Sequence, residues 1–169
     1  MKKNKKRILT IIGIIILILI IWYALIPKTD KRILRFEDEF GFNLPKDTKI
    51  IFSDSDYGSM GDGIRLYVFQ LTASEMKPLI TYKKIGGWYP LPINKEMAEG
   101  LHQHVDGLSS SRLTNKIDFN IQKGYYIIKN STYNRPLLKY NFDDQSYYNV
   151  VIGMIDTQKN LIYFCTWDM

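Results

Sequence analysis

Cysteine and histidine are scarce in this chain. Its 169 residues include one cysteine and two histidines. An internal disulfide needs two cysteines, and zinc sites of the Cys₄ or Cys₂His₂ type need two or more, so the sequence excludes both. Internal repeats and long Gly-, Ser- or Pro-rich linkers are also absent. With 46% hydrophobic and 14% aromatic residues, the composition is typical of a folded chain rather than a disordered or collagen-like one.

The excess of positive charge is confined to the N-terminus. The whole chain has 23 Lys and Arg against 17 Asp and Glu, a formal net charge of +6. Residues 1–27 contain five of the basic residues and no acidic one, which leaves 18 basic against 17 acidic residues, or +1, for residues 28–169. A nucleic-acid-binding domain carries its basic excess on the folded part. The distribution therefore argues against nucleic acid as a partner.

One long hydrophobic run follows the basic tail of residues 1–7. Residues 8–26 contain no charged side chain, and as a helix they would extend about 28 Å, close to the roughly 30 Å hydrocarbon core of a bilayer. Trp22 and Tyr23 lie near the end of the run, where aromatic rings favour the headgroup layer. A cleaved signal peptide has a shorter apolar region and ends in small residues. We therefore predict that residues 8–26 form an uncleaved transmembrane helix in the lipid bilayer.

The basic tail also predicts the orientation of this helix. Moving five positive charges outward against about 100 mV costs on the order of 11 kcal/mol. Long domains, in contrast, cross membranes largely regardless of their charge. We expect a single-pass protein of the cell membrane with a cytoplasmic N-terminus and with residues 28–169 outside. The frequent Ile, Lys, Asn and Tyr are typical of an AT-rich Gram-positive bacterium.

Residues 28–169 are expected to form one extracytoplasmic domain with an α+β fold. Its 142 residues are enough to bury about two-thirds of the surface that the unfolded chain exposes. Periodic apolar residues and caps predict the helices, and β-branched or aromatic runs predict the strands. Helices are expected at residues 30–40, after Thr72 or alternatively from Pro78, and from Asn94 to Val105. Strands are expected at residues 48–53, 64–71, 117–122, 125–129, 147–155 and 161–167.

These strands predict three hairpins in an antiparallel sheet of about six strands, packed on one face by two or three helices. Ile117, Phe119 and Ile121 alternate with polar residues, as in a strand with one exposed face. Residues 161–167 are apolar at successive positions. This last strand is therefore expected in the centre of the sheet, with both faces buried.

Helix ends and turns provide a resemblance to a known group. The pattern comprises Gly41-Phe42-x-Leu44-Pro45 after the first helix, then Ile50-Ile51, a Gly/Asp-rich tip and Trp88-x-x-Leu91-Pro92. Over residues 36–101 it resembles small uncharacterised membrane-anchored proteins of Gram-positive bacteria. The resemblance implies a membrane anchor and an α+β domain. Because that group has no assigned activity, it implies no catalytic or binding residue.

Residues 54–63, the expected tip of the first hairpin, combine three carboxylates with three glycines. Calcium sites also use carboxylates on bent loops, but the twelfth position, a glutamate in EF-hands, is Arg65 here. We therefore predict a solvated loop without metal, with glycines chosen for positive φ. Polar loops on rigid hairpins often carry binding residues. The candidate binding residues are Asp54, Asp56, Tyr57, Met60 and Asp62.

Histidine and cysteine are expected to have no catalytic or metal-binding role. His102 and His104 point about 200° apart on a helix, so the two side chains cannot share a metal and are expected at the surface. Cys165 lies in an apolar strand, whereas a reactive thiol needs a cationic and partly exposed environment. We therefore expect Cys165 to be buried. No cofactor is expected.

Two functional classes remain open. The first is a non-enzymatic binding or interaction module for an unknown envelope protein or ligand, and eleven tyrosines in residues 28–169 would suit such a surface. The alternative is a cell-wall-active hydrolase with a pair of catalytic carboxylates. Glu37 with Glu39 and Asp143 with Asp144 are pairs of this kind. The sequence does not place any pair across a cleft, so we expect the binding module.

Overall fold

The computed structural model of the chain describes residues 12–22, 29–57, 62–81, 87–108, 113, 115–137 and 149–168. The chain divides into two units, residues 1–31 and 32–169. Residues 12–22 are helical with exposed side chains, and they are the described part of the predicted span 8–26. Within the described residues, none of the helices combines the length and the hydrophobicity needed to cross a membrane.

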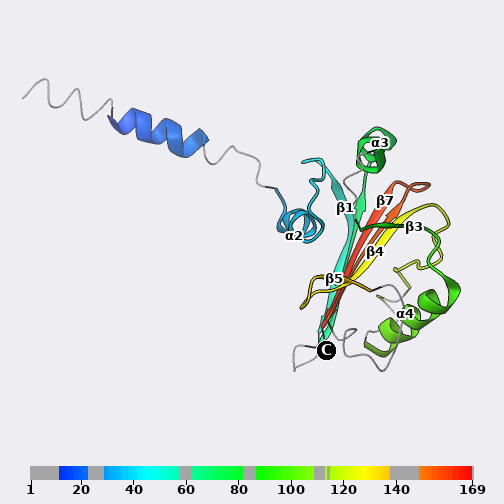
Figure 1. Cartoon of the computed structure of the whole chain (residues 1–169). Coiled ribbons are helices and arrows are strands. Elements are labelled where there is room, and N and C mark those ends of the chain that lie inside the picture. The colour runs from blue at the N-terminus through cyan, green and yellow to red at the C-terminus, as the bar shows by residue number, and fades with distance from the viewer. Residues whose placement is uncertain are drawn as a thin grey trace, which may run out of the picture. The chain divides into compact units, whose positions relative to one another are not determined.

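The second unit has an α+β fold (Figure 1). In chain order, its elements are α2 (Lys31–Phe40), β1 (Lys49–Tyr57), β2 (Gly63–Gln70), α3 (Ala73–Thr81), β3 (Tyr89–Pro90), α4 (Lys95–Leu108), β4 (Gly124–Asn130), β5 (Arg135–Pro136), β6 (Val150–Asp156) and β7 (Leu161–Asp168). All strand pairs are antiparallel, in the order β1-β2-β7-β6-β4-β3, and β5 pairs with β4. The predicted α+β class and antiparallel sheet are confirmed.

The predicted hairpins β1–β2 and β6–β7 are present, and β7 lies in the interior of the sheet between β2 and β6, as its apolar sequence predicts. The predicted third hairpin is wrong, because residues 117–122 contain turns and form no strand. Ile117, Phe119 and Ile121 are nevertheless buried, and the residues between them are more exposed. The alternation therefore indicates a segment with one side buried against the core, not a strand paired in the sheet. β4 pairs with β6, β3 and β5 instead.

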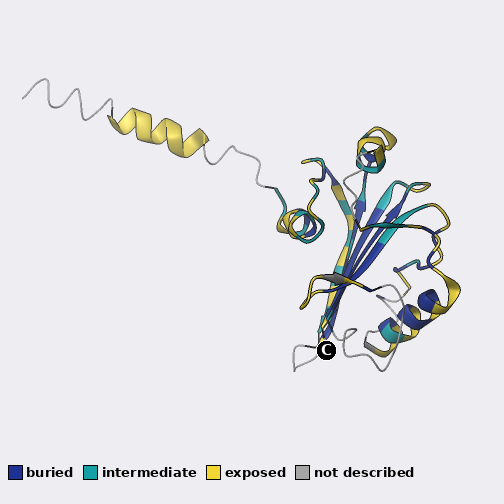
Figure 2. Ribbon diagram, viewed as in Figure 1, coloured by how far each residue is buried: buried dark blue, intermediate teal, exposed yellow. Residues whose placement is uncertain are grey.

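Helices cover both faces of the sheet, so the prediction of helices on one face is wrong. On one face, Met97, Leu101 and Val105 of α4 join a core that includes Leu66 of β2. On the other face, α2 and α3 pack against alternate residues of the same strands, such as Phe69. Figures 1 and 2 show the buried strands between α2 and α4. Because β2, β6 and β7 are apolar at successive positions, each of their faces needs a cover.

The helix ends follow their predicted caps. Thr72 N–H donates to Glu75 Oε2 at 2.7 Å, and Glu75 N–H donates to Thr72 Oγ1 at 3.3 Å, which is a capping box. α3 therefore begins at Ala73 and contains Pro78 in its interior, so the alternative start at Pro78 is wrong. Asn94 Oδ1 accepts from Met97 N–H at 2.8 Å and caps α4 as predicted.

Candidate functional site

The predicted hairpin tip is shorter than residues 54–63. Asp54, Asp56 and Tyr57 belong to β1, and Tyr57 pairs with Gly63 in β2. Met60 lies outside the described residues, and Asp62 is exposed immediately before β2. The expectation that Asp54 and Asp56 lie in a loop is therefore wrong, because strand pairing continues through both residues.

The predicted binding residues in β1 are divided between the two faces of the sheet. Asp54 and Asp56 pair with Leu66 and Ile64, which belong to the core beneath α4. Because side chains alternate along a strand, Tyr57 lies on the opposite face from Asp56. The structure therefore does not bring Asp54, Asp56 and Tyr57 together as one patch.

Tyr57 extends across the sheet over Gly63. A Cβ atom at Gly63 would lie 2.9 Å from Tyr57 Cδ1, closer than real side-chain contacts allow. The Arg65 guanidinium stacks on the Tyr57 ring at 5.1 Å, and the Tyr57 hydroxyl lies 3.5 Å from Asp168 Oδ2. Burial raises the pKa of Tyr57. Gly63 is thus needed for close approach and does not have the positive φ that the sequence predicted.

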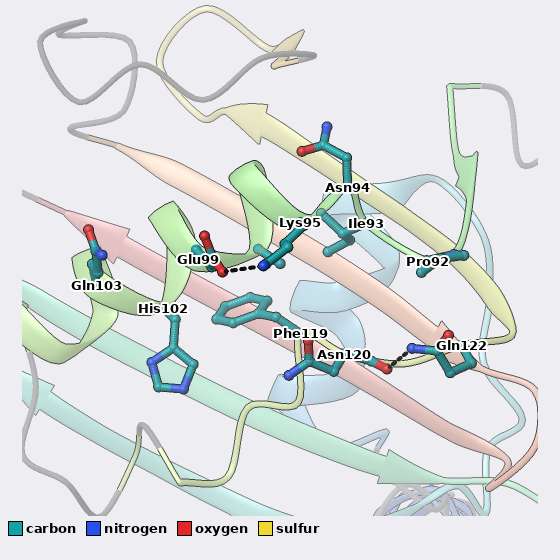
Figure 3. A pocket seen from close by; sticks show the side chains of 11 residues that line it. Pro92, Ile93, Asn94, Lys95, Glu99, His102, Gln103, Phe119, Asn120 and Gln122 are labelled. Atoms are coloured by element: carbon teal, nitrogen blue, oxygen red, sulfur yellow. Dashed lines mark hydrogen bonds and ion pairs between the residues drawn. The ribbon is translucent and has the colours of Figure 1, made fainter.

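A groove beside α4 is a second candidate site, and the sequence did not predict it. Its volume is about 690 Å³, within the usual range for small-molecule sites. Residues 92–94, the outer side of α4 and residues 119–122 enclose it (Figure 3). Ile93, Ala98 and Phe119 are apolar lining residues that are also part of the core. The polar lining residues are Asn94, Lys95, Glu99, His102, Gln103, Asn120 and Gln122.

Helix periodicity places the α4 residues on one side of the groove. Lys95, Glu99 and His102 follow one another at spacings of four and three, which lie on one helix face. The opposite side is anchored by Phe119, which is 2% exposed. Asn120 and Gln122 come from the same segment as Phe119 and also line the groove, and Figure 3 shows Asn120 below Phe119 and Gln122 toward Pro92.

Two side-chain pairs along α4 lie at the groove. Lys95 Nζ lies 3.7 Å from Glu99 Oε1, and His102 Nδ1 lies 3.1 Å from Asp106 Oδ2. The amide of Gln122 donates from Nε2 to the main-chain oxygen of Asn120 at 2.6 Å. The groove thus presents amides and balanced charges rather than an excess of one sign.

The two histidines differ in environment. His102 is exposed at the groove, as predicted. The surface expectation for His104 is wrong, because its half-buried ring packs 5.1 Å from the Trp167 ring and burial lowers its pKa. The described residues hold no cluster of three or more His, Cys, Asp or Glu side chains suited to a metal ion.

The remaining candidate residues that the structure describes are buried, hydrogen-bonded or ion-paired. Cys165 is fully buried, as predicted, and burial raises the pKa of its thiol. Glu37 Oε1 accepts from Leu44 N–H at 2.8 Å, and Glu39 Oε1 pairs with Lys129 Nζ at 2.8 Å. Asp143 and Asp144 lie outside the described residues.

The groove escaped prediction because its residues come from three separate segments. The one sequence pattern that points toward the groove is the alternation of apolar and polar residues at 117–122. It indicates that this segment has a buried and an exposed side, but it does not indicate that α4 packs beside it. Comparison of the chain with protein-family models, curated proteins and solved structures finds no match.

Proposed function

We propose that this chain is a single-pass membrane protein of a Gram-positive bacterium whose second unit is an extracytoplasmic, non-enzymatic binding module. The charge-free run of residues 8–26 supports the membrane anchor, because its length as a helix matches a bilayer. The five basic residues before the run support a cytoplasmic N-terminus. The partner is an envelope protein or ligand.

The α4 groove is the observation that carries the binding function. Its size suits a ligand, and its lining combines apolar residues with side chains that can form hydrogen bonds. Wall hydrolysis by the usual mechanism requires two carboxyl groups that flank the scissile bond. Glu99 is the one carboxylate among the described lining residues, and it is paired with Lys95. The lining therefore favours binding over hydrolysis.

Reporter fusions test the predicted location. A phosphatase that folds only outside the membrane is fused after residue 169, and a fluorescent protein that folds only inside is fused there in a matched strain. We expect phosphatase activity without fluorescence, and a mature N-terminus at residue 1 or 2. Fluorescence without phosphatase activity, or a new N-terminus between residues 24 and 30, contradicts the proposal.

A wall-digestion assay tests the reaction class. The full chain in detergent is mixed with purified Gram-positive cell walls, and turbidity and soluble sugar are followed. We expect no release of soluble fragments. Release by the native chain that Glu99→Gln abolishes would establish the hydrolase alternative and contradict the binding module.

A further inference from the structure

The charges on α2 are divided along its length. Lys31 and Arg32 lie in its first turn and Arg35 follows in the next, whereas residues 37–39 are acidic. The helix dipole favours the reverse order, with acidic residues at the N-terminal end and basic residues at the C-terminal end. α2 has no acidic residue in its first turn and no basic residue in its last. The stability of the helix therefore does not explain the position of its basic residues.

The exposed side of α2 is basic in its first half. Ile33 and Phe36 are buried, whereas Lys31, Leu34 and Arg35 are exposed. Spacings of three and four residues place these three side chains on one helix face, which we call the basic face of α2. Leu34 is 43% exposed. Among the described residues, neither Lys31 nor Arg35 forms an ion pair with an acidic side chain. The basic face thus presents two cations beside an apolar side chain.

The covalent chain keeps the basic face near the predicted membrane span. The span is expected to end at residue 26, and α2 begins at Lys31. Five residues extend at most about 18 Å. This upper limit holds for every arrangement of the two units. A bilayer crossed by residues 8–26 therefore lies within reach of the basic face, and the short link raises the local concentration of lipid headgroups there.

We propose that the basic face of α2 binds the headgroups of anionic phospholipids in the bilayer that anchors the chain. The lysine ammonium and the arginine guanidinium contact lipid phosphates, and the leucine side chain enters the boundary between headgroups and acyl chains. Basic residues next to a membrane span are attracted to anionic lipid over about one Debye length. This inference rests on the proposed function, because it requires the membrane anchor.

A dye placed within the basic face tests the proposal. The full chain with Leu34→Cys is labelled with an environment-sensitive dye, and Cys165 does not react because it is fully buried. The protein is reconstituted in nanodiscs of phosphatidylcholine, alone or with one-third phosphatidylglycerol, each containing a lipid with a quencher on its headgroup. We expect at least twofold stronger quenching in the anionic discs, lost in about 1 M salt, where the Debye length is about 3 Å. Equal quenching in both discs overturns the proposal.

A second dye position separates α2 from the rest of its unit. Gln103→Cys places the same dye at an exposed position on α4, which covers the opposite face of the sheet. We expect its quenching to be the same in neutral and anionic discs. A difference as large as that of Leu34→Cys would mean that the lipid effect is not specific to α2, which overturns the proposal.

Matched charge variants are made in the Leu34→Cys chain. Lys31→Gln combined with Arg35→Gln removes the two cations and is expected to abolish the difference between the discs. Lys95→Gln combined with Lys123→Gln removes two exposed lysines elsewhere and is expected to preserve it. The melting temperature of each variant verifies that it is folded. A difference that survives the first pair of changes, or that the second pair also abolishes, contradicts the assignment to the basic face.

A soluble polyanion separates the competing ligand class. Polyphosphate carries phosphate groups without a bilayer, so we expect no blue shift of the dye when it is added to neutral discs. A blue shift that Lys31→Gln with Arg35→Gln abolishes would assign the face to a soluble polyanion and overturn the lipid assignment. A chain that does not enter the discs contradicts the membrane anchor and this inference together. A chain that enters the discs but is quenched equally in both contradicts only this inference.

Discussion

Single glycines and buried polar groups show how closely this fold is packed. Gly153 lies in β6 beneath Phe40 and Trp88, which pack against each other with ring centroids 5.2 Å apart. Glycine leaves room for these rings because it has no Cβ atom. We predicted no role for Gly153 from the sequence, because the reason for a glycine in a strand is evident only when the side chains that pack on it are known.

Gly153→Ala is expected to destabilise the protein. Its added Cβ would lie 2.6 Å from Trp88 Cη2 and 2.8 Å from Phe40 Cζ, so both rings must shift. Overpacking of this kind costs about 1–3 kcal/mol. Urea unfolding measures the change, and Gly107→Ala in α4 is the control, because nothing lies within 4 Å of that Cβ. A Gly153→Ala variant as stable as the native chain would contradict the packing.

His104 is expected to make stability depend on pH. Burial lowers the pKa of His104 in the folded state below the ordinary value of about 6.5, so the unfolded chain binds the proton more readily. Its contribution to stability is therefore complete above about pH 6.5 and is lost as the pH falls below that value. Urea unfolding from pH 8 to pH 5 measures this loss. His104→Gln should reduce this loss, and an unchanged slope in His104→Gln would contradict the account.

At the element scale, α2 docks on the sheet through both apolar and polar contacts. Ile33 and Phe36 are buried, and Phe36 packs against Phe164 with centroids 5.7 Å apart. Lys129 of β4 donates to the main-chain oxygen of Glu39 at 2.6 Å and to its carboxylate at 2.8 Å. The apolar spacing predicted α2, but the Lys129 contact joins residues 90 positions apart and left no local signal.

Glu39→Gln is expected to weaken this docking. The Lys129 side chain is 10% exposed and Glu39 is 28% exposed, so removing the carboxylate leaves a mostly buried ammonium group with neutral acceptors. We expect a loss of about 1–3 kcal/mol in the free energy of unfolding, in the range for hydrogen bonds to charged groups. Lys129→Met combined with Glu39→Gln should be less destabilising than the sum of the single changes. Additive losses would mean that the pair contributes nothing.

The elements that the sequence predicts best are those with local signals. The caps at Thr72 and Asn94 lie within three residues of their partners, and the apolar run of β7 indicates a central strand without knowledge of its neighbours. The strand predicted at residues 117–122 was wrong because alternating apolar residues indicate which side chains are buried, not whether the backbone pairs with another strand. The groove was not predicted because Phe119 and α4 are distant in the sequence and come together only in the tertiary fold.

At the scale of the whole molecule, the charge distribution bears on where the second unit lies, and the sheet with its helices bears on what it can bind. The positive charge is concentrated before residue 8, and residues 28–169 are close to neutral. In the second unit, helices cover both faces of an antiparallel sheet, and the α4 groove opens at its surface. We propose that this unit lies outside the membrane, where it can meet an envelope ligand.

Cysteine labelling in intact cells tests this claim most directly. Gln158→Cys places a thiol in the exposed turn between β6 and β7, and the native chain is the control because Cys165 is fully buried. With a membrane-impermeant maleimide, we predict labelling of Gln158→Cys in intact cells and no labelling of the native chain. Asn4→Cys, in the basic tail, should be labelled only after permeabilisation. Labelling of Asn4→Cys in intact cells, with Gln158→Cys protected until permeabilisation, would contradict the account.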